Sequence, residues 1–126
     1  MRKPNTDESN VQMSDVLCDF CHRQWTEEIA MLEGHQGSCI CGRCLTLAYT
    51  DIILNEIDAA PQQFACPMCL ETSDDRASLD RADEPAWQSP LYEEAVICKR
   101  CIDLAATALN KDKDNNWKKP GERDES

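Results

Sequence analysis

The chain has 126 residues, of which 41% are hydrophobic and only 6% aromatic, so it has the length of one domain but few of the large side chains that fill a core. Chains that bury little apolar surface usually need cross-links or metal ions, and nine cysteines are available here. The net charge of −11 argues against nucleic acid as a partner, because phosphates are bound by lysine and arginine.

The sequence also argues against secretion and membrane insertion. Residues 1–7 contain no apolar stretch of the kind found in secretory signals. No apolar run approaches the roughly 20 residues of a membrane span. We therefore expect a cytoplasmic protein with no membrane partner. In a reducing compartment, paired cysteines favour metal ions over disulfides.

From the N-terminus, residues 1–14 are polar and aperiodic and are expected to form a disordered tail. A C-x2-C turn follows, and a short helix is expected over residues 26–32. Residues 38–41 predict a brief strand that leads into a second C-x2-C turn. Residues 44–58 predict a helix, because their apolar side chains recur at helical spacing. Together these elements form copy 1, residues 15–60.

Pro61 marks the start of a second copy, which repeats this order over residues 61–110. Both copies contain the pattern I-C-x-R-C-[LI]-x-L-A. The spacer between the two cysteine turns has 19 residues in copy 1 and 28 in copy 2, and the nine extra residues are expected in an acidic loop around 74–90. Residues 95–98 predict a strand and residues 101–109 a helix.

The chain ends in residues 111–126, which mix both signs of charge and predict a second disordered tail. Trp117 is therefore expected to have no packing partner. The negative charge is concentrated between the tails, with −6 in copy 1 and −5 in copy 2.

Four C-x2-C turns supply two sets of four thiolates, the donor set of a closed tetrahedral zinc site. The second turn of each copy lies where a helix begins, and a helix N-terminus favours negative sulfur. The turns can pair in three ways, and the repeat favours pairing within each copy because both copies then form the same object. We predict two structural Zn²⁺ ions per chain. The predicted ligands are Cys18, Cys21, Cys41 and Cys44 in site 1, and Cys66, Cys69, Cys98 and Cys101 in site 2.

Other residues with metal-binding or aromatic side chains are interpreted more simply. Cys39 falls outside the repeated pattern and is not expected to bind metal. His22 and His35 are interpreted as ordinary polar residues, because four cysteines already saturate each site. Trp25 and Trp87 lie in the two spacers and are expected to cap the cores.

Copy 1 resembles the N-terminal zinc-binding domain of ClpX, the ATP-driven unfoldase of the Clp protease. The resemblance rests on C-D-F-C at 18–21, the apolar stretch at 29–34 and I-C-G-R-C-L-T-L-A-Y-T-D-I-I at 40–53. Residues 97–104 match a second time, whereas the spacer at 70–95 does not. The chain contains no G-x-x-x-x-G-K-[ST] motif, so no ATPase is indicated.

The resemblance implies a treble-clef finger, in which a turn, a hairpin and a helix supply the ligands. It also implies a domain that dimerises and binds substrates and adaptor proteins. We therefore expect a small zinc-stabilised α+β protein whose two tandem fingers dock as a pseudo-dimer, through the helices that begin at Cys44 and Cys101.

The predicted function is a protein-interaction module with structural zinc and no enzymatic activity, since four thiolates leave no open position for water. The expected partner is another protein or an unfolded client segment, with a Clp unfoldase as one candidate. Two alternatives are a nucleic-acid-binding finger, opposed by the charge, and a rubredoxin-like electron carrier that holds iron. Rubredoxin turns continue with glycine, whereas Leu45 and Leu70 follow the cysteines here.

Overall fold

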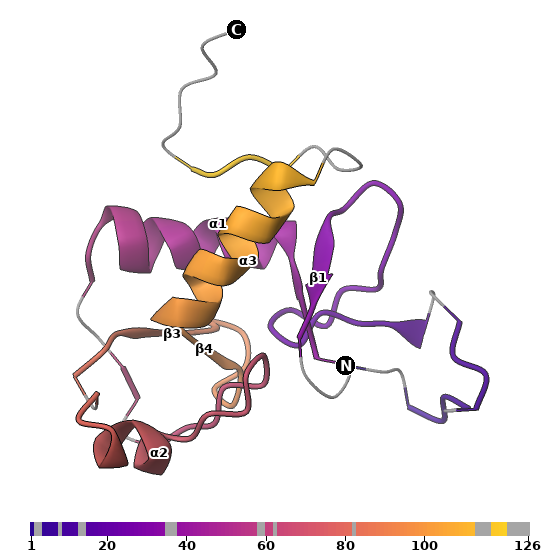
Figure 1. The fold of residues 1–126 in the computed structure, drawn as a ribbon. Helices are drawn as coiled ribbons and strands as arrows, with labels where there is room; N and C mark the ends of the chain where they lie inside the picture. The colour runs from indigo at the N-terminus through magenta and orange to yellow at the C-terminus, as the bar shows by residue number, and fades with distance from the viewer. Residues whose placement is uncertain are drawn as a thin grey trace, which may run out of the picture.

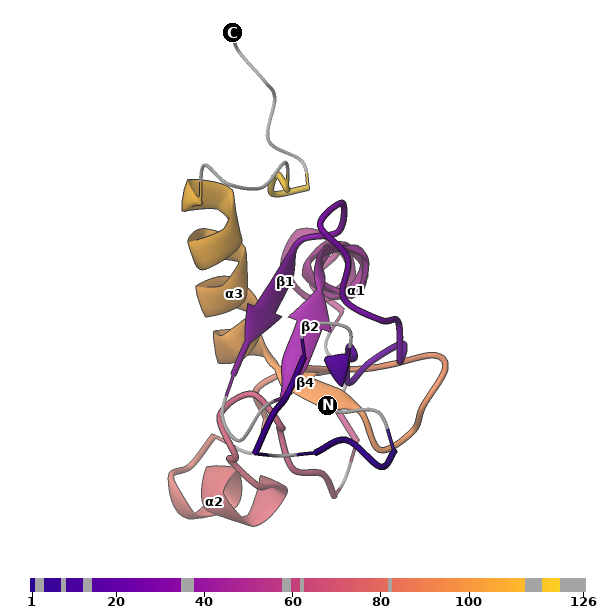
Figure 2. The ribbon, with the colours of Figure 1, turned by 90° about the vertical axis from the view of Figure 1, so that its right-hand side faces the viewer.

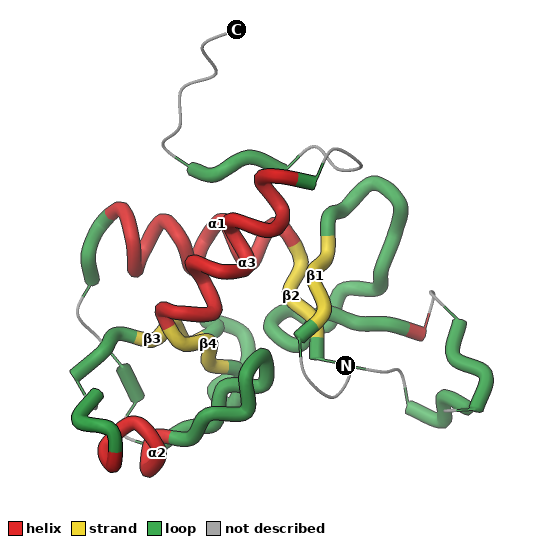
Figure 3. Tube along the Cα trace, in the orientation of Figure 1, coloured by secondary structure: helices red, strands yellow, loops and turns green. Residues whose placement is uncertain are grey.

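The computed structural model describes residues 1, 4–7, 9–12, 15–34, 38–57, 60–61, 63–81, 83–112 and 117–120. In chain order the elements are strands β1 (Met31–Glu33) and β2 (Cys39–Cys41), helix α1 (Gly42–Tyr49), the π-helical turn η3 (Thr50–Leu54), helix α2 (Ser73–Ser78), strands β3 (Ala86–Gln88) and β4 (Val96–Cys98), and helix α3 (Lys99–Lys111). The protein is a small α+β fold with two two-stranded antiparallel sheets (Figure 1 and Figure 3). Among the described residues, none of the helices combines the length and the apolar character that crossing a bilayer requires.

The two copies build their hairpins in the same register. Met31 of β1 lies opposite Cys41 of β2, and Ala86 of β3 lies opposite Cys98 of β4. The predicted strands that enter the second cysteine turns are confirmed as β2 and β4. The helix expected over residues 26–32 is wrong, because its last residues pair with β2 as β1, and the backbone N–H groups they need for a helix are used in that sheet.

A helix follows each hairpin directly. Cys41 and Cys98 have extended backbones, and α1 and α3 begin at the next residue, two positions before the predicted starts. The eight residues of α1 and the five of η3 together equal the 13 residues of α3. The third cysteine of each copy therefore precedes a helix, and the fourth lies in its first turn. The helical segment of copy 1, which is α1 together with η3, has the same length as α3.

The nine extra residues of copy 2 are divided between two places. The connection from the first cysteine turn to the hairpin covers residues 25–30 in copy 1 and 73–85 in copy 2, a difference of seven. Five residues, 34–38, separate β1 from β2, and seven, 89–95, separate β3 from β4, a difference of two.

The longer connection is not only a loop, because it contains α2. Thr72 caps this helix: its Oγ1 accepts a hydrogen bond from the Asp75 N–H at 3.1 Å, and the Asp75 carboxylate accepts one from the Thr72 N–H at 3.0 Å. Figure 1 places α2 beyond β3 and β4, away from the other helices.

The two copies share one core. A single cluster of buried side chains includes Phe20, Leu45 and Ile52 from copy 1 and Ile97 and Ile102 from copy 2. Helices α1 and α3 contact each other, and Figures 1 and 2 show that they cross rather than run side by side. The core therefore lies between the copies as well as within them.

The structure places residues from both expected tails against copy 1. The Met1 amino group donates to the Asp19 carboxylate at 2.8 Å. The interpretation of Trp117 as a residue without packing is wrong: it is partly buried, and its indole N–H donates to the Gly42 carbonyl at 3.0 Å. Trp87 is buried, as expected of a residue that covers a core, and Trp25 is half-buried.

Candidate metal centres

The first cysteine turn of each copy has the same backbone. The residue after its second cysteine, His22 or Leu70, donates its N–H to the carbonyl of the first cysteine, Cys18 or Cys66, at 2.8 and 2.7 Å. His22 and Leu70 have φ of 59° and 65°, in the left-handed region that favours glycine. The turn therefore forms without glycine, so the missing glycine does not by itself separate a zinc site from a rubredoxin-like iron site.

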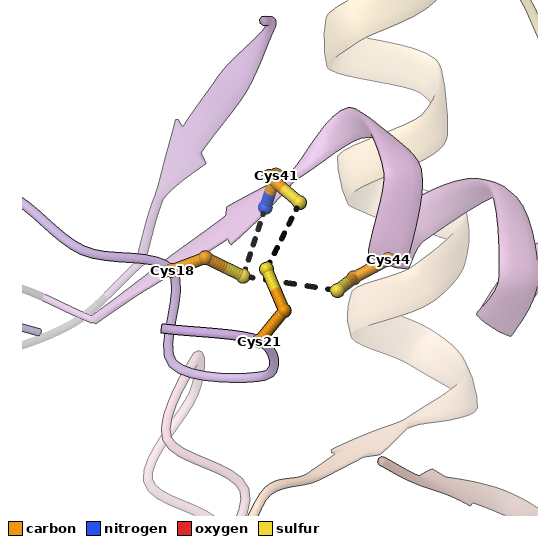
Figure 4. A group of neighbouring side chains, drawn as sticks. All are labelled: Cys18, Cys21, Cys41 and Cys44. Carbon is orange, nitrogen blue, oxygen red and sulfur yellow. Dashed lines mark hydrogen bonds between the residues drawn. The ribbon is translucent and has the colours of Figure 1, made fainter. Parts of the chain in front are cut away.

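The second cysteine turn of each copy runs from the end of a strand into a helix. The Gly42 N–H donates to the Ala30 carbonyl at 2.7 Å, and the Lys99 N–H donates to the Pro85 carbonyl at 3.2 Å. These bonds fix the strand–helix junction against the start of the hairpin. The third cysteine ends a strand and the fourth lies in the first helical turn, so both sulfurs face the first cysteine turn (Figure 4).

The structure brings together the four cysteines of each copy. In each group all four Sγ atoms lie within 4.8 Å of one another. The groups are Cys18, Cys21, Cys41 and Cys44 (Figure 4), and Cys66, Cys69, Cys98 and Cys101. Of the three ways in which the turns could pair, the structure adopts pairing within each copy.

The sulfur separations fit a tetrahedral ion. In site 1, Sγ of Cys18 lies 3.9 Å from that of Cys44, and Sγ of Cys21 lies 3.7 Å from that of Cys41. In site 2, Sγ of Cys66 lies 3.8 Å from that of Cys101, and Sγ of Cys69 lies 3.8 Å from that of Cys98. An ion bonded to four sulfurs at about 2.3 Å holds them about 3.8 Å apart, so two opposite edges of each group have the length expected in a zinc site, and the other separations stay within 4.8 Å.

Backbone donors point at the buried sulfur of Cys18. The N–H groups of Phe20 and Cys41 each donate to it at 3.3 Å. Such bonds favour the thiolate form, which is the form that binds metal, but without a metal ion the neighbouring Cys41 side chain outweighs them and raises the pKa of Cys18. Three cysteines of each group are buried and one is half-buried, so little of either site faces solvent.

The thiols within a group shift one another's ionisation. A hydrogen bond from Cys18 lowers the pKa of Cys41 to about 2, and the same bond raises the pKa of Cys18 to about 12. The contact with Cys18 also raises the pKa of Cys44. In site 2 the side-chain hydrogen bond between Cys66 and Cys101 lowers the pKa of Cys66 to about 2.

One thiolate therefore forms readily in each group, and its charge opposes ionisation of its neighbours. A divalent cation removes that opposition, and thiolates prefer zinc and other soft ions. The donor set therefore fits a tightly bound divalent metal.

Cys39 lies outside both groups, in β2, with its side chain buried. Its backbone links β2 to the first cysteine turn: its N–H donates to the Asp19 carboxylate, and its carbonyl accepts from the Asp19 N–H, both at 2.9 Å. The His22 ring stacks on Tyr92 at 3.7 Å, outside the sulfur cluster. His35 lies outside the described residues.

Two serines that the sequence did not single out join the copies. Ser38 Oγ donates to the Pro67 carbonyl at 2.7 Å, and Ser89 Oγ donates to the Phe20 carbonyl at 2.6 Å. Each serine lies in the hairpin turn of one copy, and each acceptor lies inside the first cysteine turn of the other. No pattern in the local sequence indicates these contacts.

No family model matches the sequence, and no curated protein or solved structure matches it. The fold and the sulfur geometry define the chain as a small α+β protein with two four-cysteine groups, each able to hold one metal ion.

Proposed function

We propose that the protein binds two Zn²⁺ ions, one in each four-cysteine group, and that both ions are structural. The observation that carries this proposal is the pair of sulfur separations on opposite edges of each group, 3.7 to 3.9 Å, which match the edge of a zinc–sulfur tetrahedron. Four protein ligands complete the coordination of zinc, which leaves no position for a substrate or an activated water. Each ion would bind the first cysteine turn to the strand–helix junction, and we infer no catalytic role.

The order of elements supports a description of each copy as a treble-clef finger. A cysteine turn, a hairpin and a helix follow one another twice, with the last two ligands at the junction of strand and helix. Reciprocal hydrogen bonds from Ser38 and Ser89 to the opposite cysteine turns support a pseudo-dimer of the two copies. Contact between α1 and α3 supports the same arrangement.

We propose that this double finger serves as a protein-interaction module, as the resemblance to the ClpX zinc-binding domain suggests. Support comes from an apolar hollow of about 210 Å³ between the copies, lined by Leu47 of α1 and by Pro90 and Leu91 of the second hairpin turn. Leu47 is 52% exposed and Leu91 66% exposed. Neighbouring apolar side chains that remain in water favour contact with another protein.

The metal and the interaction role are tested separately. Elemental analysis of the purified chain should give two zinc ions and no iron, whereas a red protein that contains iron would favour the electron carrier. For the interaction role, the zinc-loaded chain is immobilised and exposed to a purified Clp unfoldase and to reduced, carboxymethylated lysozyme as an unfolded client.

Binding of either probe should be lost in Leu47→Asp and kept in Leu104→Asp, which places the same charge on an exposed leucine that does not line the hollow. If neither probe binds, or if both variants bind equally, the interaction role through this hollow is wrong and the metal proposal still stands.

A further inference from the structure

The C-terminal segment, residues 117–120, lies back against the helices. Trp117 Nε1 donates to the Gly42 carbonyl and to Thr46 Oγ1, both at 3.0 Å. The Lys119 N–H donates to the Asn110 side chain, near the end of α3, at 3.1 Å. The segment therefore contacts the helix of each copy, and Figure 1 shows it in yellow beside the end of α3.

Trp117 lies against this surface and forms one wall of an adjoining hollow of about 250 Å³, and the surface and the hollow together are here called the Trp117 pocket. Besides Trp117, its lining residues are Glu28, Ile29, Ala30, Gly42, Arg43 and Thr46. The Thr46 hydroxyl donates to the Gly42 carbonyl at 2.9 Å. Both polar groups that meet the indole N–H are thus held in place by the first turn of α1.

Gly42 is required by the indole ring. A Cβ atom added at this position would lie 2.8 Å from Trp117 Cδ1, which is closer than such atoms approach in proteins. In copy 2 the corresponding residues are Lys99 and Asp103, in place of Gly42 and Thr46. The repeated finger alone therefore does not create the pocket, because the glycine and the threonine that contact the indole ring occur only in copy 1.

The charges of the segment complement the surface around it. Trp117 is followed by Lys118 and Lys119, and the pocket is formed by copy 1, whose net charge is −6. The lining itself holds one carboxylate, Glu28, and one guanidinium, Arg43. The complementarity is therefore between the two lysines and the net charge of copy 1 as a whole.

We propose that the Trp117 pocket is a binding site for a tryptophan side chain followed by lysines, and that residues 117–120 of the same chain occupy it as an internal ligand. The segment joins the end of copy 2 to the start of α1, directly beside the ligand turn of site 1. Because the segment is tethered, its effective concentration at the pocket is high, and a free segment of the same sequence competes poorly. The inference does not depend on the interaction role proposed above.

The test uses the full chain with Trp117→Ala, which vacates the pocket. The probe is a fluorescein-labelled peptide with the sequence of residues 115–120, Asn-Asn-Trp-Lys-Lys-Pro. Fluorescence anisotropy should show saturable binding of the peptide to Trp117→Ala and binding at least about tenfold weaker to the wild-type chain. A control peptide with alanine in place of tryptophan should bind neither the wild-type chain nor Trp117→Ala. Equal binding to both chains, or no binding to Trp117→Ala, overturns the proposal.

Two further measurements separate the pocket from general effects on folding. Adding Gly42→Ala to Trp117→Ala should abolish peptide binding while the metal content stays unchanged, because the new methyl group occupies the space of the indole ring. In the wild-type chain, the Trp117 indole N–H signal, assigned with Trp117→Phe, should exchange more slowly with solvent than that of the free peptide. Thr46→Val should speed this exchange, and an indole N–H that already exchanges at the rate of the free peptide overturns the proposal.

Discussion

Replacing Ser89 by alanine should lower the free energy of unfolding by about 1–3 kcal/mol, because the substitution leaves the Phe20 carbonyl without its donor. Ser89 is 4% exposed, and the hydrogen bond from its Oγ to that carbonyl is buried. The same Oγ also accepts the Leu91 N–H at 3.1 Å, so a second polar group loses its partner. Because this hydrogen bond joins copy 2 to copy 1, the lost free energy measures how strongly the two copies are held together.

The assay is urea unfolding of the zinc-loaded chain, with the free energy taken from the midpoint and slope of the transition. Ser78→Ala, on the exposed face of α2, is the matched control and should stay within about 0.5 kcal/mol of wild type. Ser38→Ala should behave like Ser89→Ala, since it removes the reciprocal bond. All three variants should keep two metal ions. If Ser89→Ala costs no more than Ser78→Ala, the hairpin serines do not hold the copies together and the reasoning is refuted.

Three other outcomes are expected. Cys41→Ser should reduce the zinc content from two ions to one and Cys39→Ser should leave it at two, and elemental analysis that finds the reverse would show that the ligand assignment is wrong. A strong chelator should abolish cooperative thermal unfolding, because six of the eight metal-ligating cysteines lie within the core that the two copies share, and a sharp calorimetric transition in the metal-free chain would contradict this. Leu70 has φ of 65°, a backbone conformation that strains any residue except glycine, and its side chain is exposed. Leu70→Gly should therefore raise the free energy of unfolding by up to about 1 kcal/mol, and Leu70→Val should lower it. Chemical denaturation that ranks the two variants the other way would refute this backbone strain.

The cysteine groups are the part of the structure that the sequence predicts best. Metal-site chemistry is local, because a C-x2-C turn brings its two sulfurs together whatever the rest of the chain does. The repeat then selects one pairing of the turns. The boundaries of the helices are less accurate: the prediction begins them at Cys44 and Cys101, but the backbone turns into a helix directly after Cys41 and Cys98.

The first strand of each hairpin could not be predicted from periodicity. Met31–Glu33 and Ala86–Gln88 are three residues long, too short to show an alternation of apolar and polar side chains. By contrast, helix α2 did have a local signal. Thr72 and Asp75 have the spacing of a capping box, and recognising it would have placed a helix start within the expected loop.

Contacts between distant residues were beyond sequence reasoning. Trp117 depends on a glycine 75 positions earlier, and Ser89 donates to a carbonyl 69 positions earlier. Neither contact follows from propensity or spacing, because each needs the two copies already docked. For the same reason, the sequence alone does not predict which side chains of the two copies are buried together in the shared core.

The central claim is that each copy holds one zinc ion with four sulfur ligands. X-ray absorption spectroscopy at the zinc edge, on the chain purified with its native metal, tests it most directly. The account predicts a first shell of four sulfur atoms at about 2.3 Å and no nitrogen or oxygen neighbour. A first shell that includes nitrogen or oxygen atoms, or a sample that contains no zinc, would contradict it.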